Sequence, residues 1–449
     1  MKTMISASEY AKRRQTLLAK LPDNSAVIIP SSAMQDRGNG TEFPFSQDRN
    51  FYYLTGFEET EACLFLSNRS DMADTEVPSN HFSLLFCLEK DKQQEIWHGR
   101  RLGVAAAPQV LAVDAAEDIE KLESQLPELL NNHDSVYLLL GQHLDNESTV
   151  FDALQTLRAA PKQSRHAPQA VIDLSPIINE MRLIKSEREI AVMQAAADMS
   201  CRAHKRAMQF AAPGKFEYQL EAEITHEFML SGARQPAYNS IVGSGENACI
   251  LHYTDNRDEL HDGDLVLIDA GADYQGYAAD ITRTFPVSGQ FSPEQKAIYE
   301  LVLNAQLSAM TLIQPGNTMK QATDRAVEVI CAGLIELGIL QGTLADVIAS
   351  MAWRQYFMHG LGHWLGLNVH DVGMYKVDGV DRPLQAGMVL TVEPGIYIDS
   401  DSEADARWHG IGVRIEDNVL ITETGHKVLT AAVPKTVADI EELMSVSTS

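Results

Sequence analysis

The stretch Leu265–Arg283, LVLIDAGADYQGYAADITR, decides the fold of this chain. It reads as two apolar strands joined by a turn at Asp273–Gly276. If Asp273 opposes Gly276, the register places Asp269 directly across from Asp280 on one face of a hairpin. The Cβ atoms of opposed residues lie about 5 Å apart, and like charges at that distance repel by ~3 kcal/mol at an effective dielectric constant of about 20, so the pair predicts a bound cation. A solvated acidic hairpin, or a β-bulge that turns one Asp away, is the alternative.

Length, composition and net charge limit the class of protein that can contain this acidic pair. The chain has 449 residues, a length for which two or three domains are expected. Its hydrophobic content of 45% supplies sizeable cores. With 36 basic and 62 acidic residues the net charge is −26, which argues against nucleic acid or an anionic membrane as a partner.

The cysteine pattern and the N-terminus predict a cytoplasmic protein. The 5 cysteines are widely spaced and lie mostly in apolar runs, so they suggest neither a disulfide framework nor a metal knuckle. The segment Met1–Leu21 carries charges and no apolar core, so we expect no signal peptide. No apolar run is long enough to span a bilayer.

Two domains are expected, 1–175 and 176–449. The first mixes helices with short strands and predicts an α/β domain. Its expected elements are the strands Ala26–Pro30, Ala62–Ser67, Phe82–Leu88 and Val136–Leu140 and the helix Ile119–Asn132. The second opens at Asp173–Pro176, after which Ser186–Glu189 forms a capping box for a long helix that ends at Pro213-Gly214.

The second domain carries a weak internal repeat of helix, Pro-Gly, helix and strand pair. Asp269 of the first half corresponds to Glu393 of the second. In the partner strand Gly412–Val419, Glu416 is expected to take the position that Asp280 holds, with Arg414 on the same face. Four carboxylates around a pseudo-twofold axis would repel one another without metal, so the repeat predicts two divalent cations rather than one.

Histidines supply the remaining ligand chemistry. His359, His363 and His370 lie between the two acidic pairs, and His252 precedes the first. One nitrogen among four oxygen ligands favours Mn²⁺, with Co²⁺ or Zn²⁺ as alternatives. A hydrogen-bonded core position is the commoner fate of a single histidine, but three within twelve positions indicate a site. The spacing of His359 and His363 would suit a separate zinc site if both lay on one helix. The glycines between them disfavour such a helix and therefore such a site.

Two other local matches are interpreted as structural. Gly243–Asn247 imitates a dinucleotide-binding loop, but it leads into the strand-like Cys249–Tyr253 instead of a helix. His226-Glu227 lacks the second histidine of a zinc protease motif, because position 230 is Leu.

Taken in order, these segments resemble the motifs of the pita-bread metallopeptidases, and within them the bacterial Xaa-Pro aminopeptidases, or aminopeptidase P. The segments are Asn239–Asn247, Ile250–Thr254, the Asp269/Asp280 hairpin, His359–His363, Val369–Gly373, Thr391–Gly395 and Gly412–Asp417, with Gln47–Phe57 and Glu95–Gly103 earlier in the chain. The resemblance implies a creatinase-like α/β N-terminal domain and an α+β pita-bread C-terminal domain with an internal pseudo-twofold repeat.

The resemblance also implies the metal ligands and the reaction. Two Mn²⁺ would be held by Asp269, Asp280, His363, Glu393 and Glu416, with Asp280 and Glu416 bridging. A hydroxide that bridges the metals would attack the carbonyl before proline, and Glu393 would take the proton of the water.

Further residues receive roles from the same resemblance. His252, His359 and His370 would bind the substrate and stabilise the oxyanion. Arg414 would hold Glu416 in place, and Tyr397 would lie close behind Glu393. Trp97 would close over the proline, although a tryptophan in an apolar strand is more often core.

At Gly38–Glu42 the chain departs from its relatives, because Gly40 stands where an acidic side chain can contact the substrate amine. That contact, from the chain itself or a neighbouring subunit, is therefore in doubt.

Three functions are compatible with these residues. The first is an Xaa-Pro aminopeptidase, acting on peptides with an Xaa-Pro N-terminus and assembled as a dimer or tetramer. The second is an Xaa-Pro dipeptidase, or prolidase, and hydrolysis of organophosphates is a side activity of either. The third is a pita-bread binding module without catalysis, which the presence of all five ligands argues against.

Overall fold

A computed structural model describes residues 4–72 and 81–445 and divides the chain into two units, Met1–Arg182 and Leu183–Ser449. The expected domain boundary at residue 175 lies at the first residue of helix α7 (Ser175–Leu183), and the division between the units lies near the end of that helix. The first three residues of Met1–Leu21 lie outside the described part, and the rest contains helix α1 (Ala7–Leu18).

The N-terminal unit is built on one mixed sheet with strand order β6-β5-β4-β1-β7-β8. Its strands are β1 (Ser25–Pro30), β4 (Cys63–Ser67), β5 (Phe82–Cys87), β6 (Ala115–Asp118), β7 (Ser135–Leu138) and β8 (Ala170–Asp173). The four expected strands are confirmed, with ends shifted by one or two residues. β1 forms the centre because its apolar residues are buried on both faces, and it pairs antiparallel with β4 and parallel with β7.

Besides α1, this unit contains further helices, of which α3 has no buried residue. They are α2 (Arg49–Thr55), α3 (Lys92–His98), α4 (Ala107–Leu111), α5 (Leu122–Leu130) and α6 (Leu144–Arg158), with a small hairpin of β2 (Asp36–Gly38) and β3 (Thr41–Glu42). One face of the sheet forms a core with α5 and α6. The expected helix Ile119–Asn132 is present as a 3-10 turn followed by α5.

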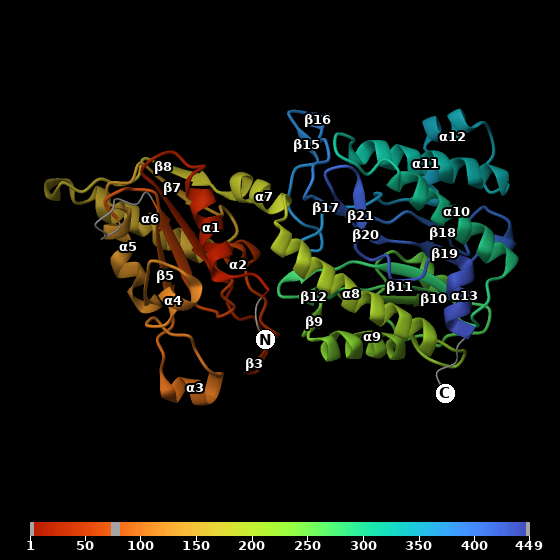
Figure 1. The fold of residues 1–449 in the computed structure, drawn as a ribbon, viewed down its shortest axis with the longest axis horizontal. Coiled ribbons are helices and arrows are strands. Elements are labelled where there is room, and N and C mark those ends of the chain that lie inside the picture. The colour runs from red at the N-terminus through yellow and green to blue at the C-terminus, as the bar shows by residue number, and fades with distance from the viewer. Residues whose placement is uncertain (1–3, 73–80, 446–449) are drawn as a thin grey trace. The chain divides into compact units, whose positions relative to one another are not determined.

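The C-terminal unit repeats one arrangement twice, a helix pair that covers a broken hairpin (Figure 1). The first half contains α8 (Glu187–Phe210), α9 (Glu217–Ser231), β9 (Gln235–Pro236), β10 (Ile241–Ser244), β11 (Leu265–Asp269), β12 (Ala272–Tyr274), β13 (Tyr277–Ala278) and β14 (Thr282–Pro286). The predicted capping box of Ser186 and Glu189 opens α8.

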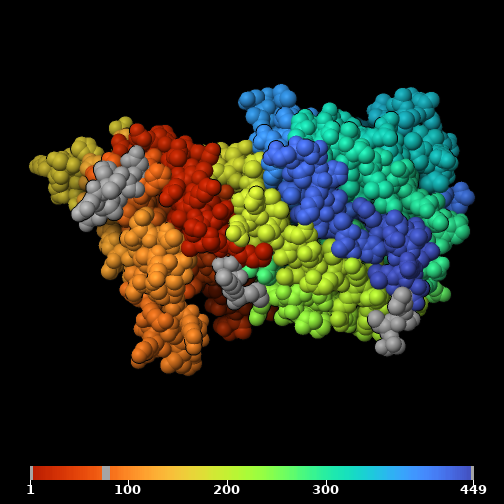
Figure 2. Space-filling model, viewed as in Figure 1, coloured from red at the N-terminus to blue at the C-terminus, as the bar shows by residue number. Residues whose placement is uncertain are grey.

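The second half contains α10 (Pro293–Met310), α11 (Met319–Glu336), α12 (Leu344–Ser350), β15 (Lys376–Val377), β16 (Val380–Asp381), β17 (Val389–Val392), β18 (Gly395–Ile398), β19 (Ile411–Arg414), β20 (Asp417–Ile421), β21 (His426–Val428) and the C-terminal helix α13 (Val437–Ser445). α13 packs against α8, and its dark blue surface lies beside the yellow-green of α8 in Figure 2. A shared core of helices and strands joins the two halves.

The predicted register of the deciding hairpin is wrong by two residues. Asp269 pairs with Thr282, and the last pair before the turn is Tyr274 with Tyr277. The turn consists of Gln275 and Gly276, whose φ values of 50° and 81° fit a two-residue hairpin turn of the primed type. Because side chains alternate with a period of two, this shift keeps Asp269 and Asp280 on one face as diagonal neighbours.

The second hairpin also differs from its prediction. The strand expected at Gly412–Val419 is interrupted between β19 and β20. The pairs Val392 with Asp417 and Gly395 with Arg414 bracket Glu393 and Glu416. Glu416 therefore lies across from Glu393, rather than at the position equivalent to Asp280.

Candidate metal centre

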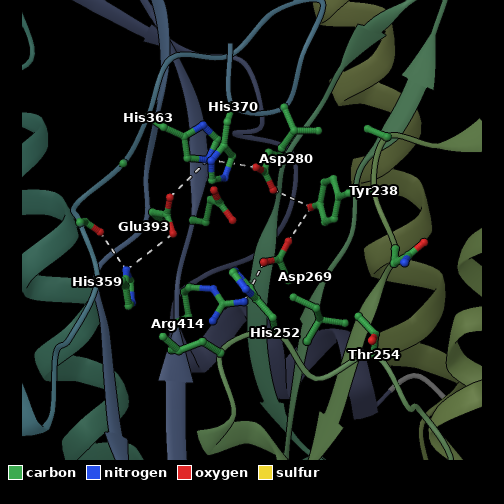
Figure 3. A pocket seen from close by; sticks show the side chains of 18 of the residues that line it. Tyr238, His252, Thr254, Asp269, Asp280, His359, His363, His370, Glu393 and Arg414 are labelled. Carbon is green, nitrogen blue, oxygen red and sulfur yellow. Dashed lines mark hydrogen bonds and ion pairs between the residues drawn. The ribbon is translucent and has the colours of Figure 1, made fainter. Parts of the chain in front are cut away.

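A cavity of about 780 Å³ opens in the C-terminal unit, and its walls come from both halves of the repeat. The predicted site residues that line it are His252, Asp269, Asp280, His359, His363, His370, Glu393, Arg414 and Glu416. Figure 3 shows most of these side chains pointing toward a common centre. The structure thus brings together the candidates that the sequence places in separate motifs.

Carboxylates and one imidazole converge at this centre. Asp280, His363 and Glu416 each offer a ligand atom, and these atoms all lie within 4.8 Å of one another. His363 Nε2 lies 3.4 Å from Asp280 Oδ2 and 3.5 Å from Glu393 Oε1. Together with Asp269 they form an oxygen-rich donor set of the kind that divalent cations take.

Electrostatics of the cluster favour a cation. Burial and the neighbouring Asp280 raise the pKa of Glu416 well above its ordinary value, and burial raises the pKa of Glu393 to about 7. Burial and Asp269 raise the pKa of Asp280. Although burial lowers it, the hydrogen bond and charge of Asp280 raise the pKa of His363 to about 9. Burial and mutual repulsion both oppose ionisation of these carboxyl groups, and a divalent cation among them would favour their ionised form.

The orientation of His363 follows from its backbone contacts. Its Nδ1 lies 3.0 Å from the Trp364 carbonyl oxygen, so Nδ1 donates and Nε2 faces the cavity as a candidate ligand atom. The backbone N–H of His363 donates to Thr391 Oγ1 at 3.0 Å. A Cβ at Gly362 would lie 1.9 Å from the Thr391 carbonyl oxygen, so only glycine allows this loop to approach β17 so closely.

Threonine hydroxyls orient two of the carboxylates. Thr282 Oγ1 donates to Glu416 Oε2 at 2.7 Å, and Thr391 Oγ1 donates to Glu393 Oε1 at 3.2 Å. Hydrogen bonds of this kind hold one oxygen of a carboxylate in place and turn its second oxygen toward a metal. The sequence motifs do not single out either threonine, although Thr391 and Glu393 are only two positions apart.

Arg414 contacts a different carboxylate from the one expected. Its Nη2 donates to Asp269 Oδ2 at 2.7 Å, and its Nε donates to Thr282 Oγ1 at 3.1 Å. It reaches Glu416 only through Thr282, because the true register sets β19 against β14. Although burial raises it, the charge of Arg414 helps to hold the pKa of Asp269 below its ordinary value.

Tyr238 is a site residue that the sequence reasoning missed. Its hydroxyl oxygen lies 2.5 Å from Asp269 Oδ1 and 2.5 Å from Asp280 Oδ1 (Figure 3). Burial and these two carboxylates raise the pKa of Tyr238 well above its ordinary value, so the phenol keeps its proton. The only signal in the sequence is its place beside the Asn239–Asn247 motif.

His359 is engaged through both ring nitrogens. Arg414 Nη1 donates to the Tyr397 hydroxyl at 3.0 Å, so the Tyr397 proton is directed to His359 Nε2, 2.8 Å away. Nδ1 then carries the ring hydrogen and donates to the Gly360 carbonyl oxygen at 2.8 Å. Burial and the charge of Arg414 lower the pKa of His359 to about 4, so the imidazole is neutral. Tyr397 itself is buried behind the cavity wall.

The other two histidines are exposed to the cavity. The His370 ring lies on that of His363 with centroids 4.0 Å apart, and both His252 and His370 are exposed. They are therefore accessible to a ligand in the cavity.

The remaining candidates belong to the N-terminal unit. Trp97 lies on helix α3 and not in a strand, because Asp91 caps this helix by accepting from the N–H groups of Gln93 and Gln94. Its side chain is 81% exposed, so it is not a core residue. Gly40 lies in the exposed turn between β2 and β3.

Family models match both units. Residues 191–423 match metallopeptidase family M24, and residues 10–137 match the N-terminal domain of aminopeptidase P. The chain is 48% identical to the Xaa-Pro aminopeptidase of Escherichia coli K12 over 440 residues, which cover 98% of each protein.

Solved structures give the same relationship. The structure of proline aminopeptidase P II from Yersinia pestis superposes with a TM-score of 0.94 at 49% identity, covering 98% of this chain and 100% of that one. That of Escherichia coli aminopeptidase P with the inhibitor Pro-Leu has a TM-score of 0.95 at 47% identity and covers 99% of both chains.

Proposed function

The chain belongs to metallopeptidase family M24, in which it is an Xaa-Pro aminopeptidase, and we propose how its residues carry out that reaction with two divalent cations. The observation that carries the proposal is the convergence of four carboxylates and one imidazole in one cavity. The comparisons favour neither a prolidase nor a non-catalytic binding module.

The proposed ligands are Asp269, Asp280, His363, Glu393 and Glu416, and the proposed cations are two Mn²⁺, with Co²⁺ or Zn²⁺ as alternatives. Four acidic side chains and one histidine suit an ion that prefers oxygen ligands. When bound, the cations supply a hydroxide at neutral pH, because they lower the pKa of water. Tyr238, Thr282, Thr391 and Arg414 orient the carboxylates through the contacts described above.

Glu393 is proposed to take the proton of the attacking water. His252 and His370 are proposed to contact the substrate and the developing oxyanion, since both are exposed in the cavity. His359 holds Tyr397, and through it Arg414, and must release one of its two hydrogen bonds before it can donate to a substrate.

Recognition of proline is proposed to rest on shape. A proline nitrogen has no hydrogen and its ring fixes φ near −65°. The exposed Trp97 offers an aromatic face for such a ring. Pro-Leu, the inhibitor bound in the related Escherichia coli structure, has the sequence that would remain after the first residue of an Xaa-Pro-Leu peptide is released.

The cellular location and the oligomeric state are proposed from the sequence. No helix in the described part of the chain is long and apolar enough to cross a membrane. The cysteines are free, in keeping with the proposed cytoplasmic location. A homo-oligomeric state stays a prediction.

A peptide series tests the proposal. The Mn²⁺-loaded protein is incubated with Ala-Pro-Ala, Ala-Ala-Ala and Ala-Pro, and the products are identified by mass spectrometry. We expect release of alanine from Ala-Pro-Ala and no cleavage of Ala-Ala-Ala. Efficient cleavage confined to Ala-Pro would contradict the proposal and indicate a prolidase.

A further inference from the structure

A buried carboxylate outside the metal centre gathers an unusual number of hydrogen bonds. Glu217 is the first residue of α9 and is 0% exposed. Its Oε1 accepts from Ser244 N at 2.8 Å, Ser244 Oγ at 3.1 Å and Asn247 Nδ2 at 3.1 Å. Its Oε2 accepts from the Tyr253 hydroxyl at 2.8 Å and from Asp258 N at 3.0 Å. These donors fill the roughly four lone-pair sites that a carboxylate offers.

All of these donors belong to one segment, residues 244–258, which carries His252 and Thr254 into the cavity. After a 3-10 turn at Gly245–Cys249 the segment contains no helix or strand until β11, so its own backbone does not fix its shape. Local hydrogen bonds to a side chain must do so instead.

The Gly243–Asn247 motif serves this anchoring. A Cβ at Gly243 would lie 2.7 Å from the Asn247 carbonyl oxygen, so glycine lets the chain fold back tightly there. The fold brings Ser244 and Asn247 onto the same carboxylate oxygen. The resemblance to a dinucleotide-binding loop is therefore explained by an internal anion, the carboxylate of Glu217.

Tyr253 makes the most direct link to the site, because it is the neighbour of His252 in the chain. Burial and the Glu217 carboxylate raise the pKa of Tyr253 to about 12, so its hydroxyl remains a donor. While this hydroxyl is held by Glu217, the adjacent His252 side chain is presented to the cavity.

We infer that Glu217 is a positioning residue, which acts through Tyr253 and Asp258 to hold His252 where it meets the substrate. A buried carboxylate that accepts hydrogen bonds from a single loop need not add much to the stability of the fold. It is well suited to holding that loop in one conformation. The inference rests on the proposed contact between His252 and the substrate. Glu217 touches neither the metals nor the substrate in this inference, yet turnover depends on it.

The test compares Tyr253→Phe with Tyr218→Phe, a matched change at the exposed tyrosine next to Glu217 on α9. Tyr253→Phe removes one hydrogen bond to Glu217 and keeps the ring. We expect kcat/KM for Ala-Pro-Ala to fall by about 10-fold to 100-fold, the effect of a misplaced catalytic group. Metal content stays unchanged, the fall in Tm is small because Glu217 keeps its other donors, and Tyr218→Phe retains full activity.

A double-mutant cycle with His252→Ala separates positioning from general loosening. If Tyr253 acts through His252, adding Tyr253→Phe to His252→Ala changes kcat/KM by less than about twofold. If the two substitutions lower kcat/KM independently, so that their effects multiply in the double variant, the inference is overturned. Full activity of Tyr253→Phe would overturn it too. If His252→Ala alone keeps full activity, the proposed role of His252 fails as well, a separate outcome.

Glu217→Gln extends the test. It keeps the shape of the side chain but turns an amide donor toward the donors of the loop, so kcat/KM should fall at least as far as in Tyr253→Phe. A fully active Glu217→Gln enzyme would overturn the inference.

Discussion

Replacing Lys185 by Met should destabilise the C-terminal unit strongly, because it removes the cation of a buried ion pair with Asp371. Lys185 Nζ lies 3.0 Å from Asp371 Oδ2, and both side chains are 1% exposed. Asp371 follows His370, and a Cβ at Gly366 would lie 2.1 Å from Asp371 Oδ2, so the pair is enclosed by the loop that lines the cavity.

The magnitude follows from this burial. Removing one partner of a buried ion pair typically costs about 3–5 kcal/mol, because the other charge cannot reach water. With both side chains almost fully enclosed, we expect Lys185→Met to fall within this range. Adding Asp371→Asn removes the carboxylate charge that Lys185 balances and keeps an acceptor for the Asn368 N–H, so the double variant should recover part of the loss.

Urea unfolding followed by tryptophan fluorescence is the assay. Trp353, Trp364 and Trp408 all lie in the C-terminal unit, so the signal reports mainly on it. A loss below about 1 kcal/mol in Lys185→Met would refute the reasoning, since that is the scale of an exposed pair. A double variant as unstable as the single one would show that the packing of the lysine stem, rather than its charge, is what matters.

Three further results are expected. Tyr238→Phe removes the hydroxyl shared by Asp269 and Asp280, so Mn²⁺ affinity measured by chelator competition should fall about tenfold or more, and unchanged affinity would contradict the assigned role. Burial and the charge of Arg69 lower the pKa of His133 to about 4. The unfolded chain therefore binds more protons below the ordinary value of about 6.5, and about 3 kcal/mol of stability present at neutral pH should be lost toward pH 4. His133→Gln should flatten this pH dependence in urea unfolding followed by circular dichroism, which includes the N-terminal unit that holds His133, and an unaltered slope would rule it out. Trp97→Ala should lower the preference for Ala-Pro-Ala over Ala-Ala-Ala at unchanged metal content, and a preference equal to that of the original protein would exclude Trp97 from proline recognition.

The deciding hairpin shows why the site was predictable although its register was not. Side chains alternate along a strand, so an error of two residues leaves Asp269 and Asp280 on the same face. The turn was misplaced because Gln275 occupies a left-handed position that Asn, Asp or Gly usually fills. The prediction that the acidic side chains share a face therefore needed only the two-residue alternation along a strand, which can be read from the sequence.

The residues that orient the ligands could not be found in the same way. Tyr238 and Asp269 are 31 positions apart, and Thr282 and Glu416 are 134 apart. The first contact joins the segment between β9 and β10 to β11 within the first half, and the second joins the two halves, so neither is encoded in a local pattern. Arg414 was placed on the correct face, but its partner was misjudged because the interruption between β19 and β20 was not anticipated.

Trp97 illustrates a different difficulty. An apolar residue next to Ile96 suggested a strand, whereas the Asp91 cap starts a short helix and leaves both side chains exposed. Capping chemistry at a single residue outweighed the apolar pattern, because a helix of this length is determined largely by its ends.

The number of divalent cations in the active protein tests the central claim most directly. The protein is saturated with Mn²⁺, passed through a desalting column, assayed with Ala-Pro-Ala and analysed for metal by mass spectrometry. Four carboxylates and His363 in one cavity predict two Mn²⁺ per chain, and removal by a chelator should abolish activity that added Mn²⁺ restores. Full activity with one ion or none per chain would contradict the account.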